Sequence, residues 1–183
     1  MSDKAALRKL AAARRKAVHG VIDATPALES LRKVLTETEG RVSFYWPIRS
    51  EIDPRPLLHE MCRDRAVCLP VTTGYAPLMF RPWAPGAAMI ADSFGVEIPT
   101  DETEVEPRVL VVPILAFDER GHRLGYGAGL YDRTLAKLRA KGPATAIGFA
   151  YEVQLAETLP IEATDQPLDV IVTEARIRRF AGA

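Results

Sequence analysis

The chain has 183 residues, with 24 basic and 24 acidic side chains, so its formal net charge is zero. This length allows one domain with a sizeable core, and the hydrophobic content of 48% is ordinary for a globular protein. The zero net charge argues against a global attraction to nucleic acid or to an anionic membrane. No apolar stretch is long enough to span a bilayer.

The two cysteines, Cys62 and Cys68, lack the spacing of a zinc site and are too few for a disulfide framework. We expect them to be buried free thiols in a reducing compartment. The N-terminus lacks the apolar core of a secretory signal peptide. We therefore expect a single cytoplasmic domain over residues 1–183, a monomer or weak homodimer without nucleic-acid or membrane partners.

The alanine-rich start of the chain predicts a helix from Asp3 to about His19. Lys4 and Arg8 are four residues apart, so they lie one above the other on its surface. Such a pair is usually two solvated charges. A cation in the first turn opposes the helix dipole, however, and a bound polyanion would reverse that penalty. The pair Arg14-Arg15 allows either interpretation, and we do not assign it.

A second helix is predicted from Pro26 to Glu37, and a strand rich in aromatic and β-branched residues from Val42 to Ile48. Residues 49–53 then form a loop at the carboxyl end of that strand, where open α/β sheets place their ligands. Glu51 lies in this loop. From the residues alone it can be an ordinary loop carboxylate or a ligand-binding group.

Strands are predicted at Val67–Thr72 and Leu78–Trp83, close enough in sequence to form a hairpin and so a mixed sheet. The segment from Ala84 to Pro107 shows no clear periodicity, and we expect a long functional loop. Further elements are expected as strands at Val109–Val112, Ala144–Ala150 and Leu168–Thr173 and a short helix at Val153–Leu159. This alternation predicts an α/β protein with one sheet covered on both faces.

A glycine-rich loop follows the Val109–Val112 strand, with glycines at 125, 127 and 129. Leu130 begins a helical pattern, and a glycine loop that opens a helix can wrap backbone N–H groups around a phosphate. The loop is neither a dinucleotide fingerprint, which would need glycine at Leu130, nor a Walker A loop, which would need G-K-[ST]. A flexible turn is the alternative. The flanking cations, aromatic ring and carboxylate favour a nucleotide–metal site: Arg123, Tyr131, Asp132 and Arg133.

The longer pattern around this loop reads Val112-Pro113 … Ala116-Phe117-Asp118 … Gly121 … Arg123-Leu124-Gly125-Tyr126-Gly127 … Gly129 … Tyr131-Asp132-Arg133. It resembles the signature of the 5-formyltetrahydrofolate cyclo-ligase family, also called 5,10-methenyltetrahydrofolate synthetase. The similarity extends from Lys4 to the Leu168–Glu174 region. Two positions depart from the common pattern: Ala128 stands where glycine is frequent, and Leu130 where an aromatic residue is frequent.

The resemblance implies a three-layer α/β sandwich with a mixed, mostly parallel sheet, as in sugar-phosphate isomerases and CoA transferases. It also implies ATP-dependent conversion of 5-formyltetrahydrofolate to 5,10-methenyltetrahydrofolate, with release of ADP and phosphate. The γ-phosphoryl group would pass to the formyl oxygen, and N10 would close the ring. Such chemistry requires positioning and charge neutralisation but no side-chain nucleophile.

By the same resemblance, the residues that contact ATP are Lys4, Arg8, Arg123, Leu124, Gly125, Tyr126, Gly127, Ala128, Gly129, Leu130 and Tyr131. Those that contact the folate are Trp46, Glu51, Phe94, Tyr126, Gly127, Ala128, Gly129 and Leu130. Mg²⁺ would be held by Asp132 and Asp165. Without the resemblance, Trp46 and Phe94 would be interpreted as packing residues and Asp165 as a turn residue.

Two other classes of function remain open from the sequence. One is a folate- or nucleotide-binding regulator that has lost catalysis, although the presence of the key charged residues argues against it. The other is a CoA transferase or sugar-phosphate isomerase, which would share the fold but not the central motif. Fold alone does not determine function.

Overall fold

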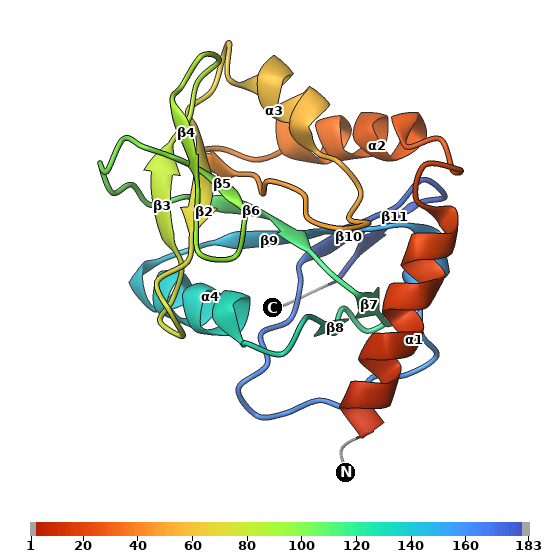
Figure 1. Ribbon diagram of the computed structural model, residues 1–183. Helices are drawn as coiled ribbons and strands as arrows, with labels where there is room; N and C mark the ends of the chain where they lie inside the picture. Colours follow the sequence, from red (N-terminus) through yellow and green to blue (C-terminus); the bar gives the residue numbers. More distant parts are fainter. Residues whose placement is uncertain (1–2, 181–183) are drawn as a thin grey trace.

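The computed structural model describes residues 3–180, and a seven-stranded sheet forms its centre (Figure 1). The strand order is β11-β10-β9-β6-β1-β2-β3. The strands are β1 (Val42–Ser43), β2 (Val67–Val71), β3 (Met79–Pro82), β6 (Val109–Pro113), β9 (Thr145–Phe149), β10 (Val170–Val172) and β11 (Ile177–Arg179). The inner strands are parallel, and only β3 and β11, at the two edges, pair antiparallel. The predicted mixed, mostly parallel sheet is confirmed.

Helices cover both faces of the sheet, which gives three layers (Figure 1). The helices α2 (Thr25–Thr36) and α3 (Arg55–Met61) pack on one face, and α4 (Leu130–Lys141) packs on the other. Within residues 3–180, no helix combines the length and apolarity needed to cross a membrane. Both cysteines are free thiols; Cys68 is buried and Cys62 half-buried.

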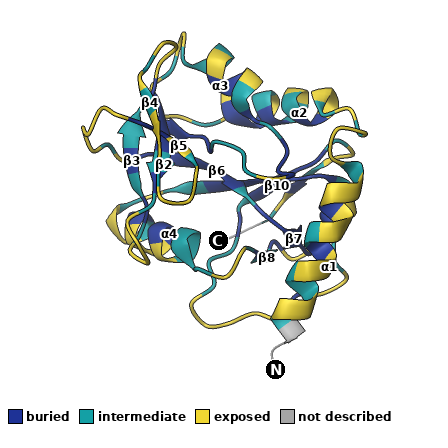
Figure 2. Ribbon diagram, viewed as in Figure 1, coloured by how far each residue is buried: buried dark blue, intermediate teal, exposed yellow. Residues whose placement is uncertain are grey.

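Strand β6 shows why its sequence is a continuous apolar run. Val109 and Val111 face the core beneath α2 and α3, whereas Leu110 and Val112 face the core beneath α4. A parallel strand buried on both faces has no solvent side, so apolar residues do not alternate with polar ones. In Figure 2 the central strands are accordingly buried, and exposed residues lie on the outer faces of the helices.

The helix α1 (Asp3–Val18) lies to one side of the sheet, against the small hairpin of β7 (Ala116–Phe117) and β8 (Arg123–Leu124) (Figure 1). A separate apolar cluster joins them, with Ala11 of α1 packed among Leu115, Leu124 and Leu159. Because β8 leads directly into the glycine loop, this cluster fixes the N-terminal helix beside that loop.

The sheet has a switch point between β1 and β6. The connection from β1 to β2 passes through α3 on one face, and that from β6 to β9 passes through α4 on the other. Chain segments diverge at such a point and leave a crevice at the carboxyl ends of the strands. The loop of residues 44–53 and the glycine loop both begin at this edge.

Three predicted elements are much shorter than expected, and one of them, the strand predicted at Leu168–Thr173, is only Val170–Val172. The strand predicted to reach Ile48 ends at Ser43. Pro47, which cannot donate to a ladder, and the turn in which the Glu51 N–H donates to the Ile48 carbonyl at 3.1 Å prevent it from extending to Ile48. The helix predicted at Val153–Leu159 is a single 3₁₀ turn, η1 (Glu152–Gln154).

The sequence predicts one long loop from Ala84 to Pro107. The structure differs, because this segment contains a hairpin formed by β4 (Met89–Ala91) and β5 (Glu97–Pro99). Its turn has a local signal in the sequence. The Asp92 carboxylate accepts from the Phe94 and Val96 N–H groups at 2.8 and 2.9 Å, and Gly95 takes φ +75°. The strands are too short to show a clear period of two.

The turn between β7 and β8 yields a stability prediction. Gly121 has φ +84°, and a Cβ there would lie 2.9 Å from the Phe180 ring and 3.1 Å from the Leu168 carbonyl. Gly121→Ala should therefore lower the free energy of unfolding by about 2–4 kcal/mol, from backbone strain plus overpacking. The measurement is urea denaturation.

Gly86→Ala is the matched control, because Gly86 has φ +83° but nothing within 4 Å of the added Cβ. Only the backbone strain applies there, so the loss should be about 1 kcal/mol. Equal losses in the two variants would show that the Phe180 contact does not restrict the turn.

Candidate active site

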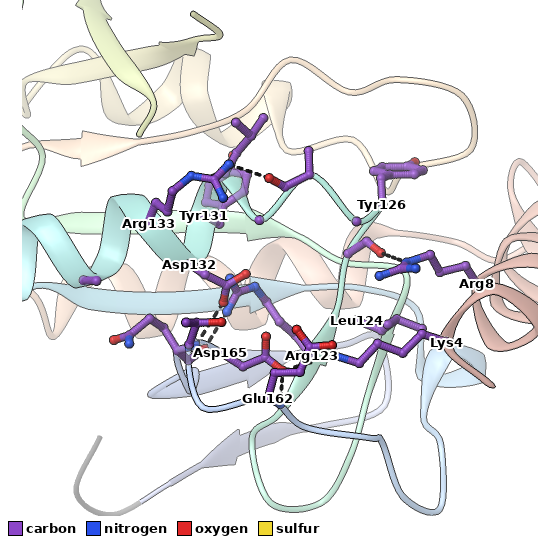
Figure 3. Close-up of a pocket in the computed structure, with 18 of the residues that line it drawn as sticks. Lys4, Arg8, Arg123, Leu124, Tyr126, Tyr131, Asp132, Arg133, Glu162 and Asp165 are labelled. Carbon is purple, nitrogen blue, oxygen red and sulfur yellow. Dashed lines mark hydrogen bonds and ion pairs between the residues drawn. The ribbon is translucent and has the colours of Figure 1, made fainter. Parts of the chain in front are cut away.

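A cavity of about 800 Å³ opens where the glycine loop meets the start of α1 and the segment of residues 162–166 (Figure 3). Its lining includes every residue that the sequence analysis assigned to ATP and both residues assigned to Mg²⁺. It also includes residues that the sequence analysis did not assign to a ligand, among them the flanking cation Arg133: Pro113, Arg133, Ala136, Glu162, Thr164 and Gln166. Side chains from three distant parts of the chain thus face one space.

The glycine loop has the backbone that its sequence suggested. Gly127 and Gly129 lie in the left-handed region, at φ +105° and +63°, and Gly129 is the residue before the first turn of α4. A Cβ at position 127 would come within 3.1 Å of the Arg8 guanidinium, whose Nε donates to the Gly125 carbonyl at 3.0 Å. Glycine is therefore needed both for the torsion and for the approach of Arg8.

The start of α4 lies on the cavity wall. The N-terminal N–H groups of a helix lack partners within the helix and attract anions. Arg133 donates to the Ala128 carbonyl and so braces the loop (Figure 3). Leu130, which replaces a frequent aromatic residue, packs partly against the core beneath α4.

Arg123 and Asp132 form the central ion pair of the cavity, with Nη2 and Oδ1 2.6 Å apart (Figure 3). The same Oδ1 accepts the Gln166 N–H at 2.9 Å, and Arg123 Nη1 donates to the Gln166 carbonyl. Only 6% of the Arg123 side chain is exposed. These contacts join β8, α4 and the segment before β10.

Lys4 occupies the other end of the group of charges. Its Nζ is 2.9 Å from Glu162 Oε1 and 3.5 Å from Asp165 Oδ2, and Asp165 also accepts the Glu162 N–H at 2.8 Å. Burial lowers the pKa of Lys4, but its hydrogen bond to Glu162 and the charges of Asp165 and Glu162 outweigh that effect and raise it. Without ligand, Lys4 and Arg123 are thus paired with carboxylates of the cavity.

The donors of the cavity fit a Mg²⁺ ion that arrives with a nucleotide. Asp132 and Asp165 line the same cavity, but residues 3–180 contain no group of three or more His, Cys, Asp or Glu side chains placed to hold a metal. Mg²⁺ typically takes one or two protein carboxylates and completes its shell with water and substrate phosphates. Two carboxylates beside a phosphate-binding loop meet that description.

The remaining residues assigned to the folate do not line this cavity. Glu51 is 4% exposed, and its Oε2 accepts the Ile48 N–H at 2.9 Å. Trp46 is half-buried, with the Arg55 guanidinium 5.1 Å from its ring centre. Phe94 is 71% exposed, in the turn between β4 and β5. The structure therefore brings together the residues assigned to ATP and to Mg²⁺, and leaves Trp46, Glu51 and Phe94 outside that cavity.

Glu51 reaches the cavity indirectly, through a buried arginine that the sequence analysis did not assign. Arg15 is 1% exposed, its Nη1 is 4.0 Å from Glu51 Oε1, and its Nη2 donates to the Tyr126 hydroxyl at 2.6 Å. Burial raises the pKa of Glu51, an effect only partly offset by the Ile48 hydrogen bond and the charges of Arg15 and Arg49. One signal was available: Lys4, Arg8 and Arg15 lie on one face of a regular helix.

Comparison with known proteins identifies relatives over most of the chain. Residues 1–174 match the 5-formyltetrahydrofolate cyclo-ligase family. The 5-formyltetrahydrofolate cyclo-ligase of Escherichia coli K12 is 33% identical over 144 residues, which is 74% of this chain and 79% of that protein. The protein of the same name from Mycolicibacterium smegmatis is 35% identical over 162 residues, covering 81% and 82% of the two chains.

The fold agrees with these sequence matches. The NMR structure of Aquifex aeolicus 5,10-methenyltetrahydrofolate synthetase superimposes with a TM-score of 0.80 at 28% sequence identity, over 98% of this chain and 94% of that one. The sequence signature, the charged cavity and the three-layer fold thus lead to the same conclusion: this chain belongs to the 5-formyltetrahydrofolate cyclo-ligase family.

Proposed function

We propose that this chain converts 5-formyltetrahydrofolate to 5,10-methenyltetrahydrofolate, with ATP as the phosphoryl donor and ADP and phosphate as products. Membership of the family supports this activity. The observation that carries the proposal is the cavity of about 800 Å³, which gathers four cations, a glycine loop at a helix start and three carboxylates. The free thiols are consistent with a reducing cytoplasm.

The reaction needs the formyl oxygen to become a leaving group. Transfer of the γ-phosphoryl group to that oxygen forms an iminium phosphate and releases ADP. N10 then attacks the formyl carbon and loses its proton to solvent, the ring closes, and inorganic phosphate leaves with the oxygen. The protein must hold the two substrates in line and balance the charge of the phosphates, rather than supply a nucleophile.

The cations of the cavity would exchange partners when ATP binds. Lys4 is paired with the half-exposed segment around Glu162, whose side chain is 65% exposed. Such pairs contribute little stability, so phosphate oxygens can replace the Glu162 carboxylate at small cost. Arg8 already contacts the glycine loop, and Arg123 lies opposite α4, so the three cations would surround the triphosphate.

Asp132 and Asp165 would hold the Mg²⁺ that accompanies ATP, which would offset phosphate charge during transfer. Both hydrogen bonds to the Asp132 side chain described above fall on Oδ1. A cation can therefore bind through Oδ2 while Arg123 and Gln166 keep the carboxylate oriented. Asp165 is linked to Lys4 and Glu162, so nucleotide binding at Lys4 would make this carboxylate available.

Glu51 would recognise the pterin. The 2-amino-4-oxo edge of a pterin presents adjacent N–H donors, which suit a carboxylate acceptor. Trp46, Phe94 and the loop from Tyr126 to Leu130 would border the folate. Phe94 is 71% exposed, so it leaves apolar surface that a flat ligand can cover.

The first prediction concerns the metal. Asp132→Asn should lower turnover at limiting Mg²⁺ by about 10-fold or more, because an amide offers no charged oxygen to the cation. The rate of methenyl formation is measured by absorbance as a function of Mg²⁺ concentration, with exposed Asp64→Asn as control. Unchanged activity at limiting Mg²⁺ would remove Asp132 from the site.

The second prediction concerns the triphosphate. Lys4→Ala and Arg8→Ala should each raise the KM for ATP by about 10-fold or more through loss of a charged phosphate contact. Without ligand, the melting temperature of Lys4→Ala should move by less than about 2 °C, because an ion pair with an exposed partner stabilises little. Lys9→Ala, an exposed cation on the same helix, is the control. Large destabilisation with unaltered ATP kinetics would show that Lys4 and Arg8 are structural.

The third prediction concerns the pterin. Glu51→Gln keeps the shape of the side chain but places an amide donor against a ligand donor, which should weaken folate binding by about 2 kcal/mol or more. ATP affinity should change little, because Glu51 and the glycine loop belong to different segments. Separate titrations with each ligand test this. Equal weakening of both ligands would indicate general loop damage, and unaltered folate binding would place the pterin elsewhere.

A further inference from the structure

We propose that Arg15 is a positioning residue, which holds the Glu51 loop and the glycine loop in a fixed relation and so sets the affinity for the folate. The inference rests on the proposed function, because it takes Glu51 as the acceptor for the pterin. It adds a residue that lies outside the cavity and outside the central motif.

The contacts of Arg15 reach three segments at the switch point. Nε donates to the Ser50 hydroxyl at 3.2 Å, Nη1 to the Ile114 carbonyl at 3.3 Å, and Nη2 to the Tyr126 hydroxyl at 2.6 Å. Ser50 precedes Glu51, Ile114 follows β6, and Tyr126 belongs to the glycine loop. One planar side chain from α1 thus joins the two loops that would border the folate.

Such an arrangement is poorly explained by stability alone. Removing a guanidinium and a carboxylate from water is costly, and apolar residues of similar volume often stabilise a fold as well as a buried ion pair does. Arg15 is 1% exposed and Glu51 4% exposed. A guanidinium, however, offers donors in a fixed fork, and this geometry fixes directions that an apolar residue cannot.

Tyr126 is the cavity residue that the Arg15 guanidinium holds in position. Tyr126 is 41% exposed on the cavity wall, while its hydroxyl accepts a hydrogen bond from the buried Arg15. The guanidinium carbons of Arg15 and Arg49 lie 5.6 and 5.1 Å from the ring centre. Arg49 has φ +55°, an unusual conformation for a residue with a side chain, beside Ser50 and Glu51. Backbone strain in this loop is consistent with a fixed ligand-binding geometry.

The charge of Arg15 also acts on Glu51. Burial raises the pKa of Glu51, and the positive charges of Arg15 from α1 and Arg49 from the same loop lower it again. The other titratable groups coupled to it are Tyr45, Tyr126 and Tyr131. Only the ionised carboxylate accepts from two N–H donors, so folate binding should weaken as the pH falls through this pKa. Loss of the Arg15 charge should move that weakening to higher pH.

The experiment compares Arg15→Met, Arg15→Lys and the control Arg14→Met, in which the neighbouring exposed arginine is replaced. Dissociation constants for 5-formyltetrahydrofolate are measured between about pH 5 and pH 9, because a carboxyl group whose pKa is raised by burial titrates in this range. ATP affinity and melting temperature are measured in parallel. Because the folate is the same throughout, its own ionisation cancels between variants.

We expect Arg15→Met to weaken folate binding by about 10-fold or more at neutral pH and ATP binding by less than about threefold. The acidic fall in folate affinity should move to higher pH in Arg15→Met. Arg15→Lys should restore the position of that fall, because the charge returns, but only part of the affinity, because the fork does not. Arg14→Met should match the unaltered protein.

Two results would overturn the inference. One is Arg15→Met behaving like Arg14→Met. The other is parallel loss of both ligands with a lower melting temperature and no change in the pH profile, which would show a purely structural role.

If Arg15→Met does not fold, Arg15→Lys and Ser50→Ala decide the question, since Ser50→Ala removes only the acceptor of Nε. Unaltered folate affinity in both would again overturn the proposal. Failure of the proposed function looks different: the unaltered protein would not bind 5-formyltetrahydrofolate at any pH, or Glu51→Gln would bind it normally.

Discussion

The cavity must hold a polyanion on a chain that carries no net charge, and this constraint governs the arrangement of the site. Dissolved salt screens the field of an exposed charge over about 8–10 Å. Attraction to a triphosphate therefore has to come from cations that lie close to it. In the proposed function, Lys4, Arg8 and Arg123 would supply that charge. Glu162 and Asp132 balance Lys4 and Arg123 in the ligand-free protein. In each of these two ion pairs, a Mg²⁺–nucleotide complex can replace the carboxylate or bind beside it. The nucleotide can therefore bind without leaving a buried charge unpaired.

The fold brings these charges together by placing three distant segments at one edge of the sheet. The strand β6 ends at the switch point, and the β7–β8 hairpin carries the chain into the glycine loop and α4. The apolar cluster around Leu115 and Leu159 fixes α1 against that hairpin, so Lys4 and Arg8 face the loop. The segment before β10 closes the cavity through Gln166 and Asp165. Ordinary packing of apolar residues therefore determines where the charges meet.

Much of this could be predicted from residues whose local chemistry is strong. The run Val109–Val112 indicates a buried strand, and the spaced glycines before Leu130 indicate a phosphate loop, because both depend on the backbone near them. The residues that the family resemblance assigned to ATP and Mg²⁺ all line one cavity. The hairpin of residues 89–99 could not be predicted, because its strands have three residues each, too few to show the alternation of buried and exposed residues that is typical of a strand.

In the sequence, Arg15 differs from its neighbour Arg14 only by its helical register, which places it on the same face as Lys4 and Arg8. Their difference lies in the docking of α1, which buries Arg15 and leaves Arg14 in solvent. The burial of Glu51 likewise cannot be predicted from local sequence, because it depends on the turn after β1 and on Arg15 of α1. Tertiary contacts, rather than local patterns, give these side chains their partners.

The most direct test of the account is a coupled measurement on the unaltered protein. Purified protein is mixed with 5-formyltetrahydrofolate, ATP and Mg²⁺, and methenyl absorbance and ADP are followed together. The account predicts that the two products form in equal amounts and that neither forms without the other substrate. Binding of both ligands without product, or release of ADP without methenyl formation, would contradict it.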